Sequence, residues 1–111
     1  MAYDEELADR IRAEVAGERD VTEMKMFGGL AFLIGGHMAV AAGGQGGLML
    51  RCDPDDTDAL LGEAGAHEFE MRGKGMRGWL RVEESAVAED DALRTWVARG
   101  TAYARSLPPK K

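Results

Sequence analysis

Cys52 is the one side chain in this sequence that combines nucleophilic chemistry with a supporting context. It is the sole cysteine, and it directly precedes Asp53 at the predicted start of a helix, where the helix dipole would favour a thiolate. Cys52 also ends an apolar strand, and a cysteine in that position usually behaves as a small hydrophobic residue. We therefore expect Cys52 to be buried, and the sequence predicts no catalytic residues.

Candidate metal ligands are equally sparse. His37, His67 and Cys52 are the soft ligand candidates, and no two of them have the close spacing that zinc sites use. Several aspartates follow Cys52, but they lack the central glycine and the closing glutamate of a calcium loop. Helix capping explains these aspartates better. The sequence therefore predicts no bound metal.

Glycines at positions 73, 75 and 78 match the spelling of a dinucleotide-binding loop. That motif requires a helix directly after it, because the N-terminus of the helix holds the pyrophosphate. The residues that follow here, Trp79 to Val82, have the pattern of a β-strand. We interpret the glycines as part of a hairpin turn and expect no cofactor.

The same hairpin carries the surface with the most functional promise. Strand alternation places Arg77, Trp79 and Arg81 on one face, opposite Leu80 and Val82. An arginine beside an exposed tryptophan can anchor a protein interface or stack on a nucleic-acid base. The alternative is that Trp79 lies in the core between arginine stems. We take these three residues as candidate partner contacts, together with the glycine bend formed by Phe27, Gly28 and Gly29.

The first element that must support this surface is an amphipathic helix. Tyr3, Leu7, Ile11 and Val15 recur every four residues, and Gly17 supplies a predicted stop.

Paired glycines then divide the apolar segments. Gly28-Gly29 predicts a bulge or bend, and Gly35-Gly36 predicts a hairpin turn. We expect strands at 22–27, 30–34, 38–42 and 48–52, a helix from 53 to about 62 or 65, strands at 67–72 and 76–82 around a turn at 73–75, and a helix at about 90–107.

This order predicts an α+β fold with two layers, in which an antiparallel sheet of five to six strands has three helices packed on one face. In chain order the elements read α-β-β-β(-β)-α-β-β-α. We expect residues 1–107 to form one domain and residues 108–111 to form a flexible tail. An exposed edge strand would allow two chains to pair as a homodimer.

Length and charge restrict the function classes. The chain has 111 residues, a net charge of −6, and no apolar run that approaches the roughly 20 residues of a membrane span. Its acidic start is the reverse of a secretory signal, and a single cysteine suits a reducing compartment. We therefore expect a cytoplasmic protein without membrane contact. The negative charge argues against direct binding to DNA.

Several short motifs occur in this order over one domain length. They are Met26-Phe27-Gly28-Gly29 with the hairpin after it, Leu48-Met49-Leu50-Arg51, Met76-Arg77-Gly78-Trp79, and a final helix with Leu93, Trp96 and Ala102-Tyr103-Ala104-Arg105. Together they resemble the N-terminal domain of the TfoX/Sxy family. The resemblance implies a two-layer fold with an antiparallel sheet and no catalytic residues. Longer members are linked to natural competence as co-regulators of transcription and carry a second, helical domain.

We therefore expect a small cytosolic regulatory module that binds a protein partner and has no catalytic activity. Because the sequence ends before any second domain, we expect no direct DNA role. One alternative is a small-molecule binder or enzyme that uses a cleft between sheet and helices, where His37, Cys52 or carboxylates would meet. The other is weak nucleic-acid binding through the basic hairpin at residues 72–81.

Overall fold

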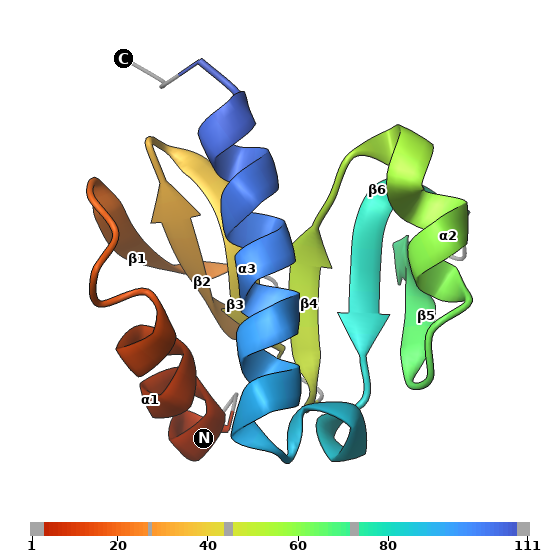
Figure 1. Ribbon diagram of the computed structural model, residues 1–111, viewed down its shortest axis with the longest axis horizontal. Helices are drawn as coiled ribbons and strands as arrows, with labels where there is room; N and C mark the ends of the chain where they lie inside the picture. Colours follow the sequence, from red (N-terminus) through yellow and green to blue (C-terminus); the bar gives the residue numbers. More distant parts are fainter. Residues whose placement is uncertain (1–3, 27, 44–45, 72–73, 109–111) are drawn as a thin grey trace.

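The protein has an α+β fold in which one six-stranded antiparallel sheet is covered by three helices, as predicted (Figure 1). The computed structural model describes residues 4–26, 28–43, 46–71 and 74–108. The elements are α1 (Glu5–Glu14), β1 (Val21–Met26), β2 (Gly29–Ile34), β3 (His37–Ala42), β4 (Leu48–Arg51), the 3-10 turn η1 (Pro54–Asp56), α2 (Thr57–Leu61), β5 (Ala66–Met71), β6 (Lys74–Val82), the 3-10 turn η2 (Glu84–Val87) and α3 (Asp90–Ser106).

Aspartate caps start the first two helical segments. The carboxylate of Asp4 accepts hydrogen bonds from the backbone N–H groups of Glu6 and Leu7 at 2.9 and 3.2 Å. Asp53 caps η1 in the same way, through the N–H of Asp55 at 2.9 Å. Each cap satisfies N–H groups that have no partner within the helix. The predicted capping role of Asp53 is therefore confirmed.

The predicted end of the first helix at Gly17 is wrong. α1 ends at Glu14, and Val15 leaves helical geometry with φ −97° and ψ 6°. The side chain of Val15 is 3% exposed and belongs to the core. Val15 extends the buried stripe of Leu7 and Ile11 by one position, and the helix ends there, two residues before the glycine.

The first glycine pair reverses the chain instead of bending one strand. β1 and β2 pair antiparallel, and Met26 lies opposite Gly29. Gly28, in the connection between them, has φ +74°, a conformation that favours glycine in tight hairpin turns. The predicted bulge is therefore wrong at this position. Gly35-Gly36 does form the predicted turn, with φ of +60° and +87°.

The second hairpin has a shorter connection than the sequence predicted. β6 begins at Lys74, which pairs with Met71, so only positions 72–73, which lie outside the described residues, connect the strands. The predicted turn at 73–75 is wrong, because Lys74 and Gly75 already pair within the ladder. A register shift between Glu68 and Glu70 accommodates the unequal strand lengths.

The strand order β1-β2-β3-β4-β6-β5 leaves β1 and β5 at the two edges. α1 and α3 lie on the same side of this sheet, with α2 beside β5 and β6 (Figure 1). The main core lies between helices and sheet, and includes Ile11, Leu93, Trp96, Phe32 and Leu80. None of the helices in the described parts of the chain has the length and apolar character that crossing a membrane requires.

A second apolar cluster lies on the opposite face and consists of strand residues alone. Its buried members are Ala31, Leu33, Met38, Ala41 and Met49. Phe69 and Trp79 are half-buried and pack against this cluster. We call this side of the sheet the helix-free face, since no helical residue among those described belongs to the cluster.

Candidate functional site

Trp79 and Arg81 lie on the helix-free face, where strand alternation placed them. In β6, Leu80 is fully buried in the main core, while Trp79 packs on the second cluster. Trp79 is half-buried and Arg81 is exposed. The side chain of Arg77, the third predicted contact, lies outside the part that the structure describes.

The other predicted contacts are not close to Trp79. Gly28 and Gly29 lie at the turn between β1 and β2, and Phe27 falls outside the described residues. In the sheet order, β3 and β4 separate β2 from β6. Strand spacing of about 4.8 Å puts β2 and β6 roughly 14 Å apart. The two predicted patches are therefore separate surfaces.

Trp79 instead belongs to a stack of four side chains. The ring centroids of Phe69 and Trp79 are 6.3 Å apart with an interplanar angle of 39°. The guanidinium carbon of Arg51 lies 5.4 Å from the centroid of Trp79 and 5.6 Å from that of Tyr103. All four side chains are half-buried. We call this set, Phe69, Trp79, Arg51 and Tyr103, the aromatic ladder.

The ladder joins the two sides of the sheet. Phe69 and Trp79 pack on the helix-free face, whereas Tyr103 belongs to α3 on the helix-covered side. Arg51 ends β4, and its position between the two rings connects the sides. The sequence alone did not indicate Arg51 and Tyr103 as site residues, because their meeting depends on where α3 crosses the sheet. That Arg51 lies opposite Trp79 on a neighbouring strand could have been predicted only with the strand order known.

A buried threonine holds the backbone beside Trp79. Gly78 has φ +85°, and its N–H donates to Oγ1 of Thr57 at 2.9 Å. The carbonyl of Gly78 accepts from the N–H of Cys52 at 2.8 Å. Thr57 is 1% exposed, so this bond has no competition from water. η1 and α2 thereby fix the start of the segment that carries Trp79.

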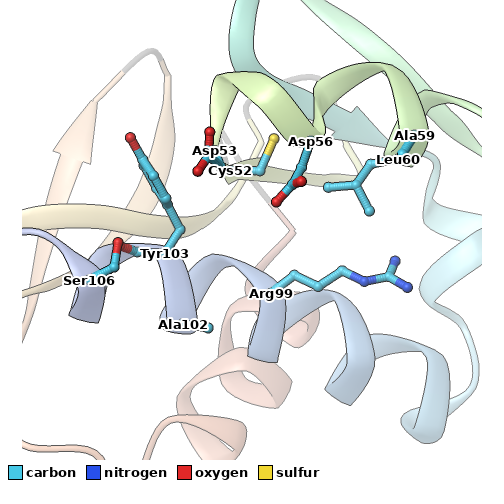
Figure 2. Close-up of a pocket in the computed structure, with 9 residues that line it drawn as sticks. All are labelled: Cys52, Asp53, Asp56, Ala59, Leu60, Arg99, Ala102, Tyr103 and Ser106. Carbon is cyan, nitrogen blue, oxygen red and sulfur yellow. The ribbon is translucent and has the colours of Figure 1, made fainter.

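Cys52 is buried, as expected. Its side chain is 2% exposed, and its Sγ lies 3.8 Å from Oγ1 of Thr57. The sulfur points toward the η1–α2 segment (Figure 2). These contacts suit a cysteine that packs as a small hydrophobic residue.

An open groove lies on the other side of the ladder, between α3 and the η1–α2 segment. Its volume is about 480 Å³. Figure 2 shows two rows of side chains facing each other across it. One row comes from residues 52–60 and the other from α3; together they are Cys52, Asp53, Asp56, Ala59, Leu60, Arg99, Ala102, Tyr103 and Ser106.

The groove carries opposite charges on its two walls. Asp53 caps η1, Asp56 ends it, and Arg99 comes from α3. Arg99 donates to Glu63 at 2.9 Å, and its guanidinium carbon lies 4.5 Å from the centroid of Trp96. Arg99 is therefore held in place by an ion pair and by a ring. The groove therefore has carboxylates of residues 53 and 56 on one wall and the paired guanidinium of Arg99 on the other.

The histidines do not join this groove. His37, at the start of β3, has its Nε2 2.6 Å from the carbonyl oxygen of Pro108. His67, on β5, lies 3.3 Å from Glu83. The meeting of His37 with Cys52 that a cleft enzyme would need is therefore not found. No three His, Cys, Asp or Glu side chains within the described ranges lie close enough to hold a metal ion.

Comparison with known proteins gives one match. The family described as "TfoX N-terminal domain" matches residues 13–104. This range includes the sheet, α2, the aromatic ladder and most of α3. No curated protein and no solved structure matches the chain.

Proposed function

The chain belongs to the TfoX N-terminal domain family, and we propose that it is a small regulatory module that acts by binding a protein partner, without catalysis. The family suggests a regulatory or competence-related role. The single cysteine suits the reducing cytoplasm as its location.

The aromatic ladder is the observation that carries this proposal. Arginine, tryptophan and tyrosine are the residue types most enriched among the residues that dominate binding energy at protein interfaces. Trp79, Arg51 and Tyr103 supply one of each within a single stack, and all are half-buried. Such side chains are held in position by their neighbours but keep surface for a partner. Less conformational entropy is then lost on binding.

The charge beside the ladder indicates the chemistry of the partner. Arg81 is exposed on the same face as Trp79, and Arg51 lies against the ring. A partner that presents an apolar or aromatic side chain flanked by carboxylates would complement this surface. The net charge of −6 opposes attraction to nucleic acid, so we propose a protein partner and not DNA.

Affinity capture from a native lysate tests the proposal. The bait is the wild-type chain, compared with Arg51→Gln and with Arg94→Gln as a matched control. Arg94 is an exposed arginine of α3 whose bonds go to Glu14 and Asp91 and not to the ladder. We expect a specific partner that binds wild type and Arg94→Gln but is lost or strongly depleted with Arg51→Gln.

Thermal unfolding of each bait shows that the variants remain folded. A Trp79→Phe bait adds a second test, because it keeps an aromatic ring but removes contact area. If the captured proteins are the same for wild type, Arg51→Gln and Trp79→Phe, the ladder is not the binding surface and the proposal is wrong.

The groove supports a second candidate function, small-molecule binding. Its volume of about 480 Å³ lies within the range of typical ligand sites, roughly 300–1,000 Å³. A screen of small polar metabolites by thermal shift tests it. A ligand that raises the unfolding midpoint of wild type, but not of Arg99→Gln, would support this function. A panel in which no compound shifts wild type would argue against it.

A further inference from the structure

β1 presents an unpaired strand edge. Among the described strands, it pairs with β2 alone and stands at the end of the sheet (Figure 1). The four residues from Thr22 to Lys25 are all exposed, and the side chain of Met24 is 51% exposed. Met24 is the one large apolar side chain among the described residues that is exposed to this degree. A strand edge with free backbone groups and an apolar side chain is a template for strand pairing.

The loop before β1 is bonded to other parts of the fold. A guanidinium nitrogen of Arg105, in α3, donates to the carbonyl oxygen of Arg19 at 2.6 Å. The carbonyl oxygen of Asp20 accepts from the N–H of Gly35 at 3.1 Å. Both bonds hold the loop toward α3 and the β2–β3 turn. Within the described parts of the chain, no strand pairs with the outer edge of β1.

We propose that β1 pairs antiparallel with β1 of a second copy of this chain, around a two-fold axis through Met24. In this register Glu23 of each copy lies opposite Lys25 of the other. Opposite charges directly across a strand pair stabilise it, and like charges destabilise it. An axis through Glu23 or through Lys25 would place two like charges against each other, so the charge pattern selects the register centred on Met24.

The two faces of the joined strands are each satisfied in this register. Glu23 lies opposite Phe32 in the pairing of β1 with β2, on the helix-covered side. Both of its carboxylate oxygens accept hydrogen bonds from the guanidinium of Arg12, at 2.7 and 2.8 Å. Lys25 has no ion-pair partner among the described residues and is available to the second copy. Met24, which lies opposite Ala31, faces the helix-free side. The two Met24 side chains would cover each other at the seam.

The opposite edge of the sheet does not offer the same pairing. In β5, Glu68 and Glu70 flank Phe69, so an axis through Phe69 would place glutamate against glutamate twice. The register shift between Glu68 and Glu70 also makes this edge irregular, and such bulges oppose strand pairing. The homodimer therefore forms through β1, and one antiparallel sheet continues across both copies. This inference does not depend on the partner binding proposed for the ladder.

Sedimentation equilibrium over a range of protein concentrations tests the proposal. We expect wild type to form a dimer whose population rises with concentration. Lys25→Glu places carboxylates opposite each other in both charge pairs, and Glu23→Lys does the same with ammonium groups. Each single variant should raise the dissociation constant about tenfold or more. An equimolar mixture of the two should recover a heterodimer, because their charges are then complementary.

Glu68→Lys, at the other edge, is the matched control and should dimerise as wild type does. Circular dichroism of each variant establishes that it is folded. A wild type that stays monomeric at every concentration overturns the proposal. So does a dimer that Lys25→Glu leaves intact, or one that Glu68→Lys dissociates. A mixture of Lys25→Glu and Glu23→Lys that stays monomeric overturns the register.

Discussion

Gly100 lies where α3 packs tightly against β3, and replacing it with alanine tests this packing. A Cβ atom at this position would lie 2.4 Å from the carbonyl oxygen of Ala39 and 2.8 Å from Cγ1 of Val40. Side-chain Cβ atoms essentially never come closer than 3.0 Å to such atoms, so α3 would have to withdraw by roughly 0.6 Å. The obstructing oxygen belongs to the backbone of β3, a central strand that cannot easily move.

The magnitude follows from two opposing effects. Alanine is favoured over glycine inside a helix by about 1 kcal/mol. Overpacking of a well-packed core costs about 1–3 kcal/mol, and a backbone obstruction places this site at the upper end. The net expectation is that Gly100→Ala lowers the free energy of unfolding by about 2 kcal/mol.

Urea unfolding of Gly100→Ala measures this loss, which should lower the midpoint by about 1 M. Gly17→Ala is the control, because a Cβ at Gly17 meets nothing within 4 Å and its φ is not positive. We expect Gly17→Ala to be as stable as wild type or more stable by about 0.4–1 kcal/mol. A Gly100→Ala variant at least as stable as wild type would show that α3 does not press on β3 in this way.

Three further predictions concern the contacts of individual side chains. Thr57→Val removes the acceptor of the Gly78 N–H and should lower the free energy of unfolding by about 1–3 kcal/mol, which urea unfolding measures; an unchanged midpoint would contradict it. Arg51→Ala should cost about 1 kcal/mol in the same assay through its two ring contacts, and acrylamide should then quench Trp79 more strongly. The hydrogen bond and the positive charge of the Arg12 guanidinium lower the pKa of Glu23 below its usual 4.5. The stabilisation from Glu23 is therefore present above its unfolded-state pKa and is lost as pH falls through the lowered folded-state pKa. Wild type should consequently lose more stability on acidification than Glu23→Gln. Equal losses of stability, or an NMR titration of Glu23 without the lowered pKa, would refute this.

Local interactions made much of the fold predictable. The cap at Asp53 and the turn at Gly35-Gly36 involve atoms within a few residues of each other, so residue type alone indicated them. The stripes of α1 and α3 followed from helical spacing, and Ile11, Leu93 and Trp96 are buried as the pattern required. The antiparallel α+β arrangement followed from short connections between strands.

Errors arose where a local pattern fits two geometries. A glycine pair suits both a bulge and a tight turn, and only the pairing of Met26 with Gly29 distinguishes them. α1 ends at Glu14, and Gly17, whose φ is not positive, does not form the predicted cap. In the second hairpin, Lys74 is not a residue type that favours turns, and its pairing with Met71 places it in β6.

Only part of the candidate site could be predicted from the sequence. Alternation along β6 correctly placed Trp79 and Arg81 on the face opposite Leu80. It gave no means to find Arg51, which lies opposite Trp79 because β4 and β6 are neighbouring strands in the sheet. The same strand order separates Gly28 from Trp79, although the sequence suggested both as contacts.

The sequence by itself determined the family, the class of fold and the buried stripes of α1 and α3, since these depend on residue type and on spacing along the chain. The tertiary structure alone decided that β6 enters between β4 and β5, and therefore that Arg51 stacks between Trp79 and Tyr103. Such contacts join positions about 30 to 50 residues apart, and their geometry follows from strand order and the path of α3. No local preference encodes a distance of that kind.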